Sequence, residues 1–437
     1  MPPRVAPFGV LMTRHAMTMK PGRWKTPLAI AATVAAAEAA VLLLRPRRDP
    51  IEPAPVRAAD YFSDGELERA RAFRRPQRAI ALAGLALDAG LLAWLVSGRP
   101  GPPALLRRPA RRPAVAGAAA GAALSVGMSA AGLPLAAVSR KRSLDVGLAT
   151  QSWQGWAGDI AKAQAIGAVF AGGGGAAAVA LMRRYPRAWW APGAGLLVGV
   201  GVAVTWLGPV VLDPIFNRFT PLPEGTTRSD VLDLARRAGV EVGEVFEVDA
   251  SRRTTAGNAY VNGLGRTKRV VLFDTLLRDF ERDEVRLVVA HELGHVRHDD
   301  VRRSLAMLAL LAPAAMLAIA LVAEELQPEG EPPGPAALPA VALAATLVGF
   351  PVRAVANQLS RRVEKRTDEF ALDLTGAPEP FIGFEKRITV QNVMEPDPPR
   401  WAEMLFGTHP TTLERIGAAI AFRDAARPAG RETPAGS

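Results

Sequence analysis

The sequence predicts a mostly α-helical protein that crosses a membrane about seven times and carries a small α+β unit on one side. Three observations favour this fold class. Seven apolar stretches are each about 20 residues long, the length that a helix needs to cross the hydrocarbon core. Arginine-rich segments separate these stretches, although hydrophobic residues make up 49% of the 437 residues. A polar region with strand-like alternation, residues 213–302, lies between the fifth and sixth stretches.

The seven predicted spans lie near residues 27–44, 79–97, 114–138, 163–182, 188–212, 304–323 and 336–356. The first span follows basic residues, as a signal peptide does, but it is long and no clean cleavage site follows it. We therefore interpret it as an uncleaved span. The fourth span, AQAIGAVFAGGGGAAAVALM, is interrupted by a run of glycines. Small residues allow helices to pack closely in membranes, so we retain it as a span.

Charge patterning predicts the orientation of these spans. No Lys or Arg occurs between Arg303 and Arg353, so the acidic loop EELQPEGEPPGP is expected on the outer side. Residues 213–302 and 357–437 are then both cytoplasmic, and the arginine-rich loop after the first span agrees. The basic N-terminal tail would lie outside, against the same rule. Either orientation leaves the two large polar segments on one face of the membrane.

These features divide the chain into five parts. They are a basic N-terminal tail at 1–26, spans one to five at 27–212, the α+β unit at 213–302, spans six and seven at 303–356, and a C-terminal segment at 357–437. The α+β unit is predicted to contain a helix at 228–240, a strand within 242–251, a strand, turn and strand within 258–277, and a helix at 282–300. Residues 357–375 are predicted to form another helix directly after span seven.

Composition excludes several classes of function. The chain has no cysteine, which excludes disulfides, thiol catalysis and zinc sites built from cysteine. The net charge of +11 comes from residues that flank the apolar runs, as expected for contact with anionic lipid head groups. No aromatic-rich basic patch is present, so we expect a lipid bilayer and no nucleic acid as partner. The excess of arginine over lysine, with much Ala, Gly and Pro, indicates a bacterial genome and hence a bacterial cytoplasmic membrane.

The stretch VVAHELGHVRHDD, residues 288–300, contains three of the five histidines of the chain. On a helix, His291 and His295 lie one turn apart on the same face, so both can ligate one zinc ion. Glu292 is rotated away from the ligands and can reach a water molecule, as a general base must. His298 lies about 10 Å along the axis from His291, too far to join the same site. The pattern predicts a zinc-dependent peptidase.

The third protein ligand must come from elsewhere in the chain. In SRRVEKRTDEFA, Glu364 and Asp368 share a helix face, so Glu364 can ligate zinc while Asp368 hydrogen-bonds a ligand histidine. The alternative is that Glu364 pairs only with neighbouring arginines. Spacing alone leaves both open.

Several motifs in a fixed order resemble the type I CAAX prenyl protease family of integral-membrane zinc endopeptidases. The resemblance covers about residues 142–422. It rests on SLDVGLATQSWQGWAGD, DPIFNRFTPL, GNAYVNG, RVVLFDTLL, AHELGHVRHD, SRRVEKRTDEFALDL and FGTHPTTLERI. The resemblance implies seven long helices around a water-filled chamber, with one zinc ion per chain bound near the cytoplasmic face. It also implies protein or peptide substrates associated with the membrane.

The same resemblance implies a role for individual residues. His291, His295 and Glu364 would ligate zinc. Glu292 would be the catalytic glutamate, and Asp368 would support a ligand. Asn258, Ala259 and Tyr260 fall on the edge strand that aligns a substrate backbone by strand addition. His409 and Arg415 fall on the segment whose cationic donors stabilise the tetrahedral oxyanion.

Two alternatives to a CAAX-type activity remain at this point. One is a quality-control protease with the same chemistry and broader substrates, which a bacterial origin favours. The other is a non-enzymatic transporter or scaffold with structural zinc, although a structural site needs no adjacent general base. One departure from the family is Ala256, which stands where a histidine is common before the edge strand.

Overall fold

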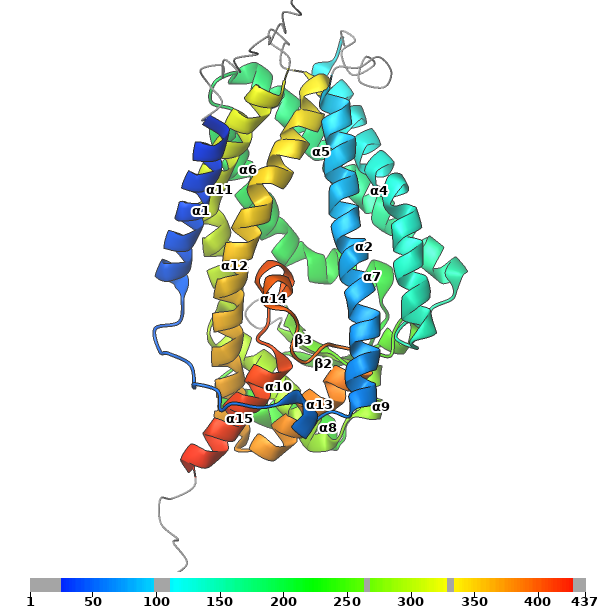
Figure 1. Ribbon diagram of the computed structural model, residues 1–437, viewed down its shortest axis with the longest axis vertical. Helices are drawn as coiled ribbons and strands as arrows, with labels where there is room; N and C mark the ends of the chain where they lie inside the picture. The colour runs from blue at the N-terminus through cyan, green and yellow to red at the C-terminus, as the bar shows by residue number, and fades with distance from the viewer. Residues whose placement is uncertain (1–24, 98–110, 263–267, 328–333, 427–437) are drawn as a thin grey trace, which may run out of the picture.

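The computed structural model of the chain describes residues 25–97, 111–262, 268–327 and 334–426. The predicted N-terminal tail lies almost wholly outside these residues. Half of the acidic loop between spans six and seven (328–333) and the turn at 263–267 also lie outside them. The described chain is mostly helical with one small mixed sheet (Figure 1). This confirms the predicted fold class.

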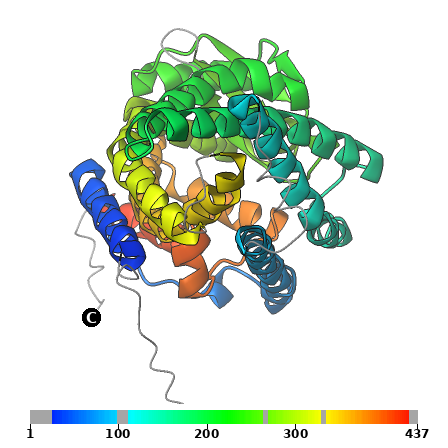
Figure 2. The same cartoon turned by 90° about the horizontal axis from the view of Figure 1, so that it is seen from above.

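Seven helical segments in the described residues are long and apolar enough to cross a membrane, as predicted. They are α1 (Lys25–Leu44), α2 (Asp64–Val96), α4 (Pro113–Asp145), α5 (Trp153–Arg184), the segment formed by α6 (Trp190–Leu207), η2 (Gly208–Leu212) and α7 (Asp213–Phe216), α11 (Asp300–Leu326), and α12 (Leu338–Thr375) preceded by η5 (Pro335–Ala337). Seen from above, they are spread around the long axis of the molecule (Figure 2). A water-filled chamber between them stays a prediction.

The glycine-interrupted fourth span is a regular helix, α5, that packs along α4. Gly117 and Gly121 of α4 meet the backbone of Gly175 and Ala171 so closely that a β-carbon at either position would overlap a carbonyl oxygen. Small residues therefore permit this helix pair, as the sequence indicated. A second group of spans, α1, α11 and α12, packs through apolar residues such as Val41, Leu311 and Leu359.

The α+β unit lies at one end of the spans, together with the C-terminal helices (Figure 1). Its four strands have the order β1-β2-β4-β3, in which β2 and β4 are parallel and the outer pairs are antiparallel. The strands are β1 (Phe219–Pro221), β2 (Glu244–Val248), β3 (Ala259–Asn262) and β4 (Arg269–Phe273). The sheet packs against α8 (Thr226–Ala238) and α10 (Arg282–Arg297) through a core that includes Leu234, Leu272 and Leu293.

Three local predictions change in the structure. The DTLL end of the predicted strand pair is a short helix, α9 (Asp274–Asp279). The predicted helix at 282–300 ends at Arg297, because Asp299 adopts a left-handed conformation (φ 53°) before α11 begins at Asp300. The predicted helix at 357–375 is not a separate element, since span seven continues without a break as α12.

The C-terminal segment folds onto the α+β unit. It contains α13 (Pro378–Gln391), α14 (Arg400–Phe406) and α15 (Thr412–Ala426). Two single turns, η1 (Ala58–Asp60) and η3 (Ala250–Arg252), complete the described elements. α13 and α15 pack around Phe381, Ile416 and Leu372, which places them against the end of α12. The two polar segments of the chain therefore meet at one end of the molecule.

Candidate metal centre

The site is built where α10 crosses the polar half of α12. A capping box at Glu281 and Glu284 starts α10, and apolar residues such as Val289 and Leu293 bury one side of it in the sheet core. On the other side, Gly294 lies so close to α12 that a β-carbon would come within 2.9 Å of Thr367 Cγ2 and 3.0 Å of Phe370 Cδ1. The glycine of HELGH therefore sets the distance between the two helices.

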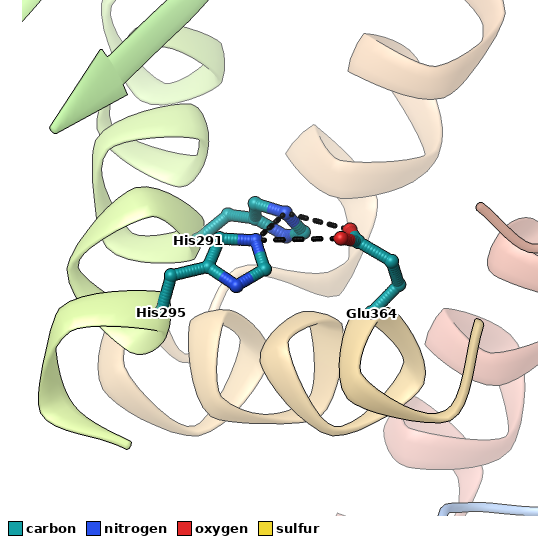
Figure 3. Close-up of side chains that lie close together, drawn as sticks. All are labelled: His291, His295 and Glu364. Atoms are coloured by element: carbon teal, nitrogen blue, oxygen red, sulfur yellow. Dashed lines mark hydrogen bonds and ion pairs between the residues drawn. The ribbon is translucent and has the colours of Figure 1, made fainter. Parts of the chain in front are cut away.

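This crossing brings together His291 and His295 from α10 and Glu364 from α12 (Figure 3). One ligand atom from each lies within 4.8 Å of the others. Glu364 Oε2 is 3.2 Å from His291 Nε2, and Glu364 Oε1 is 3.5 Å from His295 Nε2. The two Nε2 atoms are 3.2 Å apart. Three residues separated by as many as 73 positions thus converge on one point, as a metal site requires.

A carboxylate lies behind each histidine. His291 Nδ1 is 2.9 Å from Asp368 Oδ1, and His295 Nδ1 is 3.0 Å from Asp300 Oδ2. An ionised carboxylate only accepts hydrogen bonds, so each Nδ1 carries the hydrogen and each Nε2 presents a lone pair. The two Nε2 atoms face each other at hydrogen-bonding distance. This close approach is favourable when a cation, either a proton on one ring or a metal ion between both, lies at that point.

The carboxylate of Glu364 points to the same conclusion. Its Oε2 atom is buried and makes no hydrogen bond of good geometry within the described residues, although His291 Nε2 and His409 Nε2 lie 3.2 and 3.3 Å away. Two neutral imidazoles and one carboxylate match the protein ligand set of catalytic zinc sites, which leave a position open for water or substrate. The residues present therefore fit a divalent metal ion.

The electrostatics of His291 also favour a bound cation. Burial lowers the affinity of this imidazole for a proton, but the neighbouring carboxylates of Asp368 and Glu364 outweigh burial and raise its pKa to about 10. The cluster therefore has an excess of negative charge that attracts either a proton or a metal ion.

Glu292 lies between the two ligand histidines in sequence and is partly buried. Burial raises the pKa of its carboxyl group, while the nearby His291 and His295 lower it. A carboxylate with raised proton affinity beside a metal site is suited to accept a proton from water.

Arg415 from α15 lies behind Asp368. Its Nε and Nη2 donate to the two oxygens of Asp368 at 2.8 and 2.6 Å, and its Nη1 is 2.6 Å from Glu385 Oε1. The carboxylate of Glu385, from α13, is 98% buried. Burial raises the pKa of Glu385 to about 7 despite the nearby arginine. Sequence analysis missed Glu385, whose pairing across α13 and α15 leaves no local pattern.

Asp300 is the second functional neighbour that sequence analysis missed. It is the first residue of α11 and accepts two hydrogen bonds from Arg366, at 2.7 and 2.6 Å, while also pairing with Arg303. The left-handed Asp299 turns the chain so that this side chain faces back toward His295. The sequence feature that could have indicated Asp300 is a carboxylate five residues after the second histidine.

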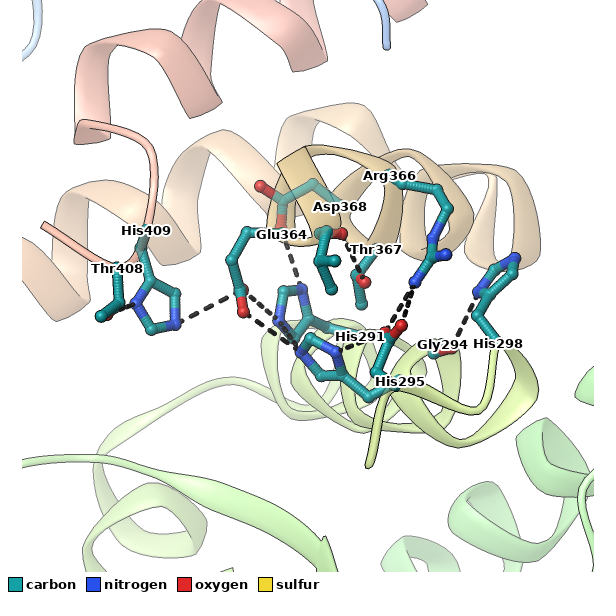
Figure 4. A network of polar contacts seen from close by, with 12 residues as sticks. His291, Gly294, His295, His298, Glu364, Arg366, Thr367, Asp368, Thr408 and His409 are labelled. Carbon is teal, nitrogen blue, oxygen red and sulfur yellow. Dashed lines mark hydrogen bonds and ion pairs between the residues drawn. The ribbon is translucent and has the colours of Figure 1, made fainter. Parts of the chain in front are cut away.

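His409 approaches the metal centre from the segment before α15 (Figure 4). Its Nε2 is 3.3 Å from Glu364 Oε2, its Nδ1 is 2.9 Å from Thr408 Oγ1, and its side chain is 58% exposed. His298 turns away, with Nδ1 2.8 Å from Gly294 O and its ring against Phe370. The predicted exclusion of His298 agrees with this geometry.

Ala259 and Tyr260 begin β3, and Asn258 directly precedes it. β3 is an edge strand that pairs only with β4 in the described sheet. β3 also lies against α10. Ala259 is buried, and the ring of Tyr260 packs against Phe273 with centroids 6.4 Å apart. Among the described residues, the other edge of β3 pairs with no strand, and β3 lies near the helix that carries the two histidines.

Comparison with known proteins links these features to one family. Residues 221–422 match peptidase family M48. The chain is 30% identical over 300 residues to the "Uncharacterized metalloprotease YhfN" of Bacillus subtilis (strain 168), a match that covers 65% of this chain and 68% of that protein.

Eukaryotic relatives match over shorter segments. The CAAX prenyl protease 1 homolog of Oryza sativa subsp. japonica is 30% identical over 232 residues, which span 51% of this chain and 54% of the relative. CAAX prenyl protease 1 of Saccharomyces cerevisiae is 46% identical over 88 residues, 20% of this chain and 19% of the relative. The crystal structure of S. mikatae Ste24p has the same fold, with a TM-score of 0.71, 20% identity, and coverage of 91% of this chain and 97% of that chain.

Proposed function

Because the chain belongs to peptidase family M48, we propose that it is a zinc metalloendopeptidase that hydrolyses peptide bonds at the surface of a membrane. Family membership makes it a membrane metallopeptidase related to CAAX prenyl protease 1, so the non-enzymatic scaffold is set aside. The observation that carries the proposal is the convergence of His291, His295 and Glu364 beside a partly buried glutamate.

His291, His295 and Glu364 would hold one zinc ion per chain. When bound, zinc supplies Lewis-acid chemistry that activates water and polarises a peptide carbonyl. Asp368 and Asp300 keep the histidine Nε2 atoms deprotonated and correctly oriented for ligation.

Glu292 is proposed as the general base. It accepts a proton from the attacking water and then donates that proton to the leaving amine. Burial, which raises the pKa of this carboxyl group, favours the first transfer. His409 is proposed to donate through Nε2 to the oxyanion, because that atom lies 3.3 Å from Glu364 and its side chain is accessible.

For Arg415 we propose a positioning role in place of the predicted oxyanion contact. Its guanidinium donates to both oxygens of Asp368 and also pairs with Glu385. A donor directed at two buried carboxylates is not directed at a developing oxyanion. Arg415 instead fixes Asp368, which in turn fixes His291.

The substrate backbone is proposed to add to β3 as a further strand. Asn258, Ala259 and Tyr260 would then align an extended peptide next to α10, with main-chain hydrogen bonds providing affinity independent of sequence. This mode suits an endopeptidase that accepts different side chains.

The names of the eukaryotic relatives favour a CAAX-type substrate, a peptide with a prenylated C-terminal motif. The alternative is a broader quality-control protease that degrades damaged membrane proteins. The proposed location is a bacterial cytoplasmic membrane, as the composition indicates, with the zinc site near its cytoplasmic face.

The test is cleavage by the full chain in lipid nanodiscs, before and after removal of metal with a chelator. We expect cleavage to stop on chelation and to return with stoichiometric zinc. Two substrates would be compared, a farnesylated C-terminal CAAX peptide and an unfolded membrane segment. Cleavage of the second alone overturns the prenyl assignment, and cleavage that survives complete metal removal overturns the proposed function.

A further inference from the structure

A second polar site lies on a neighbouring face of α12. It is a cavity of about 670 Å³ between the segment after α1, α12 and α14, which we term the basic pocket. Six cationic side chains line it: Arg45, Arg48, Arg361, Arg362, Lys365 and Arg400. Only three acidic residues, Asp49, Glu403 and Glu414, accompany them. The volume falls within the range of pockets that hold small ligands.

Most of this positive charge is not neutralised by the protein. Lys365 pairs with Glu414 at 2.8 Å. Arg361 pairs with the carboxylate of Glu403 at 3.7 Å and donates to the carbonyl oxygens of Glu403 and Gly407. Within the residues that the structure describes, the other four arginines form no ion pair, and all four are exposed. Four cations gathered at one concave surface repel each other, so an anionic ligand there gains favourable energy from each of them.

The level of the pocket in the molecule indicates which anion it meets. Leu42 and Leu43, at the end of α1, are 58% and 71% exposed, as expected for side chains in the hydrocarbon region. Arg45 follows directly. α14 lies beside α12 near the lower end of α1 in Figure 1, and exposes Trp401 and Met404 by 42% and 54%. Exposed tryptophan next to arginine is typical of the membrane–water interface.

We propose that the basic pocket binds the phosphate head group of an anionic phospholipid from the leaflet on the side of the metal centre. Arginine is suited to this role because its planar guanidinium binds phosphate through two hydrogen bonds. Basic pockets between transmembrane helices are a recognised location for such head groups. A free phosphate ion shares this chemistry, but it would gain nothing from the exposed leucines of α1 and Trp401, which are close in the chain to the pocket residues Arg45 and Arg400.

Occupation of the pocket has a structural consequence near the metal centre. Arg361 Nη1 lies 2.7 Å from Gly407 O and 3.2 Å from Glu403 O, so it connects α12 to the end of α14. His409 follows two residues later. A lipid held between α12 and Arg400 of α14 therefore stabilises the segment that presents His409 to Glu364.

The test measures binding and needs no protease activity, so it is independent of the proposed function. Full-length protein in detergent would be titrated with dihexanoyl phosphatidylglycerol, dihexanoyl phosphatidylcholine or inorganic phosphate. The readout is the thermal unfolding midpoint, since a ligand that binds the folded state raises it. The pocket variant is Arg362→Gln/Arg400→Gln. The matched control is Arg71→Gln/Arg75→Gln, two exposed arginines of α2 outside the pocket.

Phosphatidylglycerol is expected to stabilise the wild type and the control variant, whereas phosphatidylcholine is not. At about 5-fold per arginine, the pocket variant should bind phosphatidylglycerol about 25-fold more weakly. If the pocket variant and the control variant bind phosphatidylglycerol with the same affinity, the site is overturned. Inorganic phosphate could raise the unfolding midpoint of the wild type as much as phosphatidylglycerol does, and fail to raise that of the pocket variant. That result overturns the lipid assignment and makes the ligand a soluble phosphate.

Discussion

Among the described residues, charged side chains are paired on one face of α12, whereas exposed arginines at a neighbouring face are unpaired. On the face toward α10, each charged group has a partner: Asp368 binds His291 and Arg415, and Glu364 faces both ligand histidines. On the face toward α1 and α14, exposed arginines such as Arg362 have no carboxylate partner within the described residues. The same helix thus carries two groups of charges. On one face they are paired within the protein, which we term the closed network, and on the other, the open face, exposed arginines have no such partners among the described residues.

The two faces of α12 differ in whether their charges position other residues or remain available to a ligand. Charges that are buried and paired fix the geometry of one another, and removing one leaves the rest uncompensated. Exposed charges without partners contribute little to stability and are available to a ligand. The two faces should therefore respond oppositely to substitution: the α10 face in stability and metal affinity, and the α14 face in ligand binding alone.

The largest effect is expected for Arg415→Gln. It leaves the carboxylates of Asp368 and Glu385 buried without their shared cation, and should lower the free energy of unfolding by about 3–5 kcal/mol. The control is Arg423→Gln on the same helix, whose pairs with Glu379 and Asp424 are exposed and are worth about 0–1 kcal/mol. Thermal and denaturant unfolding in detergent would measure both. If the two variants had the same free energy of unfolding, the closed network would not stabilise the fold.

The next effect concerns Glu385 and pH. Burial raises the pKa of this carboxyl group to about 7, above the value of about 4.3 for a glutamate in an unfolded chain. The folded state therefore holds the proton more tightly, so this group stabilises the fold below about pH 4.3, and that stability declines as pH rises to 7. Glu385→Gln should remove the decline, gaining up to about 3 kcal/mol over wild type between pH 5 and 7.5. A pH-independent difference between the two proteins would contradict the assignment.

A smaller effect is expected for the two carboxylates behind the histidines. Asp368→Asn and Asp300→Asn should each weaken metal binding by about 10–100-fold, because the neutral amide no longer fixes the histidine tautomer. Asp373→Asn, an exposed acidic residue on the same helix as Asp368, should leave metal affinity unchanged. Competition with a zinc chelator of known affinity measures all three. If Asp368→Asn and Asp300→Asn bound zinc with wild-type affinity, these carboxylates would not support the ligand histidines.

The smallest effect on stability is expected on the open face. In lipid-free detergent, Arg362→Gln/Arg400→Gln should change the free energy of unfolding by less than about 0.5 kcal/mol, as for exposed residues in general. Metal content should also remain that of the wild type. A loss of several kcal/mol would show that these arginines are structural, and the contrast between the two faces would fail.

Local patterns explain what the sequence predicted well. Helical spacing sets His291 and His295 on one face without any knowledge of the fold, and runs of apolar residues locate the spans. Glu364 needed more than spacing, because its approach to α10 depends on span seven returning to the same membrane face. The edge position of β3 rested on family resemblance, and strand order in the structure agrees with it.

What the sequence did not predict depends on long-range contacts. Asp300 lies only five residues after His295, but a left-handed residue at 299 is needed to turn it toward the imidazole. Glu385 lies on a different helix from its partner Arg415, and its burial is set by tertiary packing. The basic pocket combines three separate segments whose arginines are each unremarkable in sequence. None of these three features produces a periodic pattern of residues in the sequence.

Zinc content and cleavage rate, measured on the same preparation of Glu292→Gln, distinguish a general base from a metal ligand at this position. We expect about one zinc ion per chain, as in wild type, because Glu292 is not among the three convergent ligand residues. The cleavage rate should be about 10²–10⁴-fold below that of wild type, the usual contribution of a general base. Cleavage by the zinc-loaded variant at the wild-type rate would show that Glu292 is not the general base.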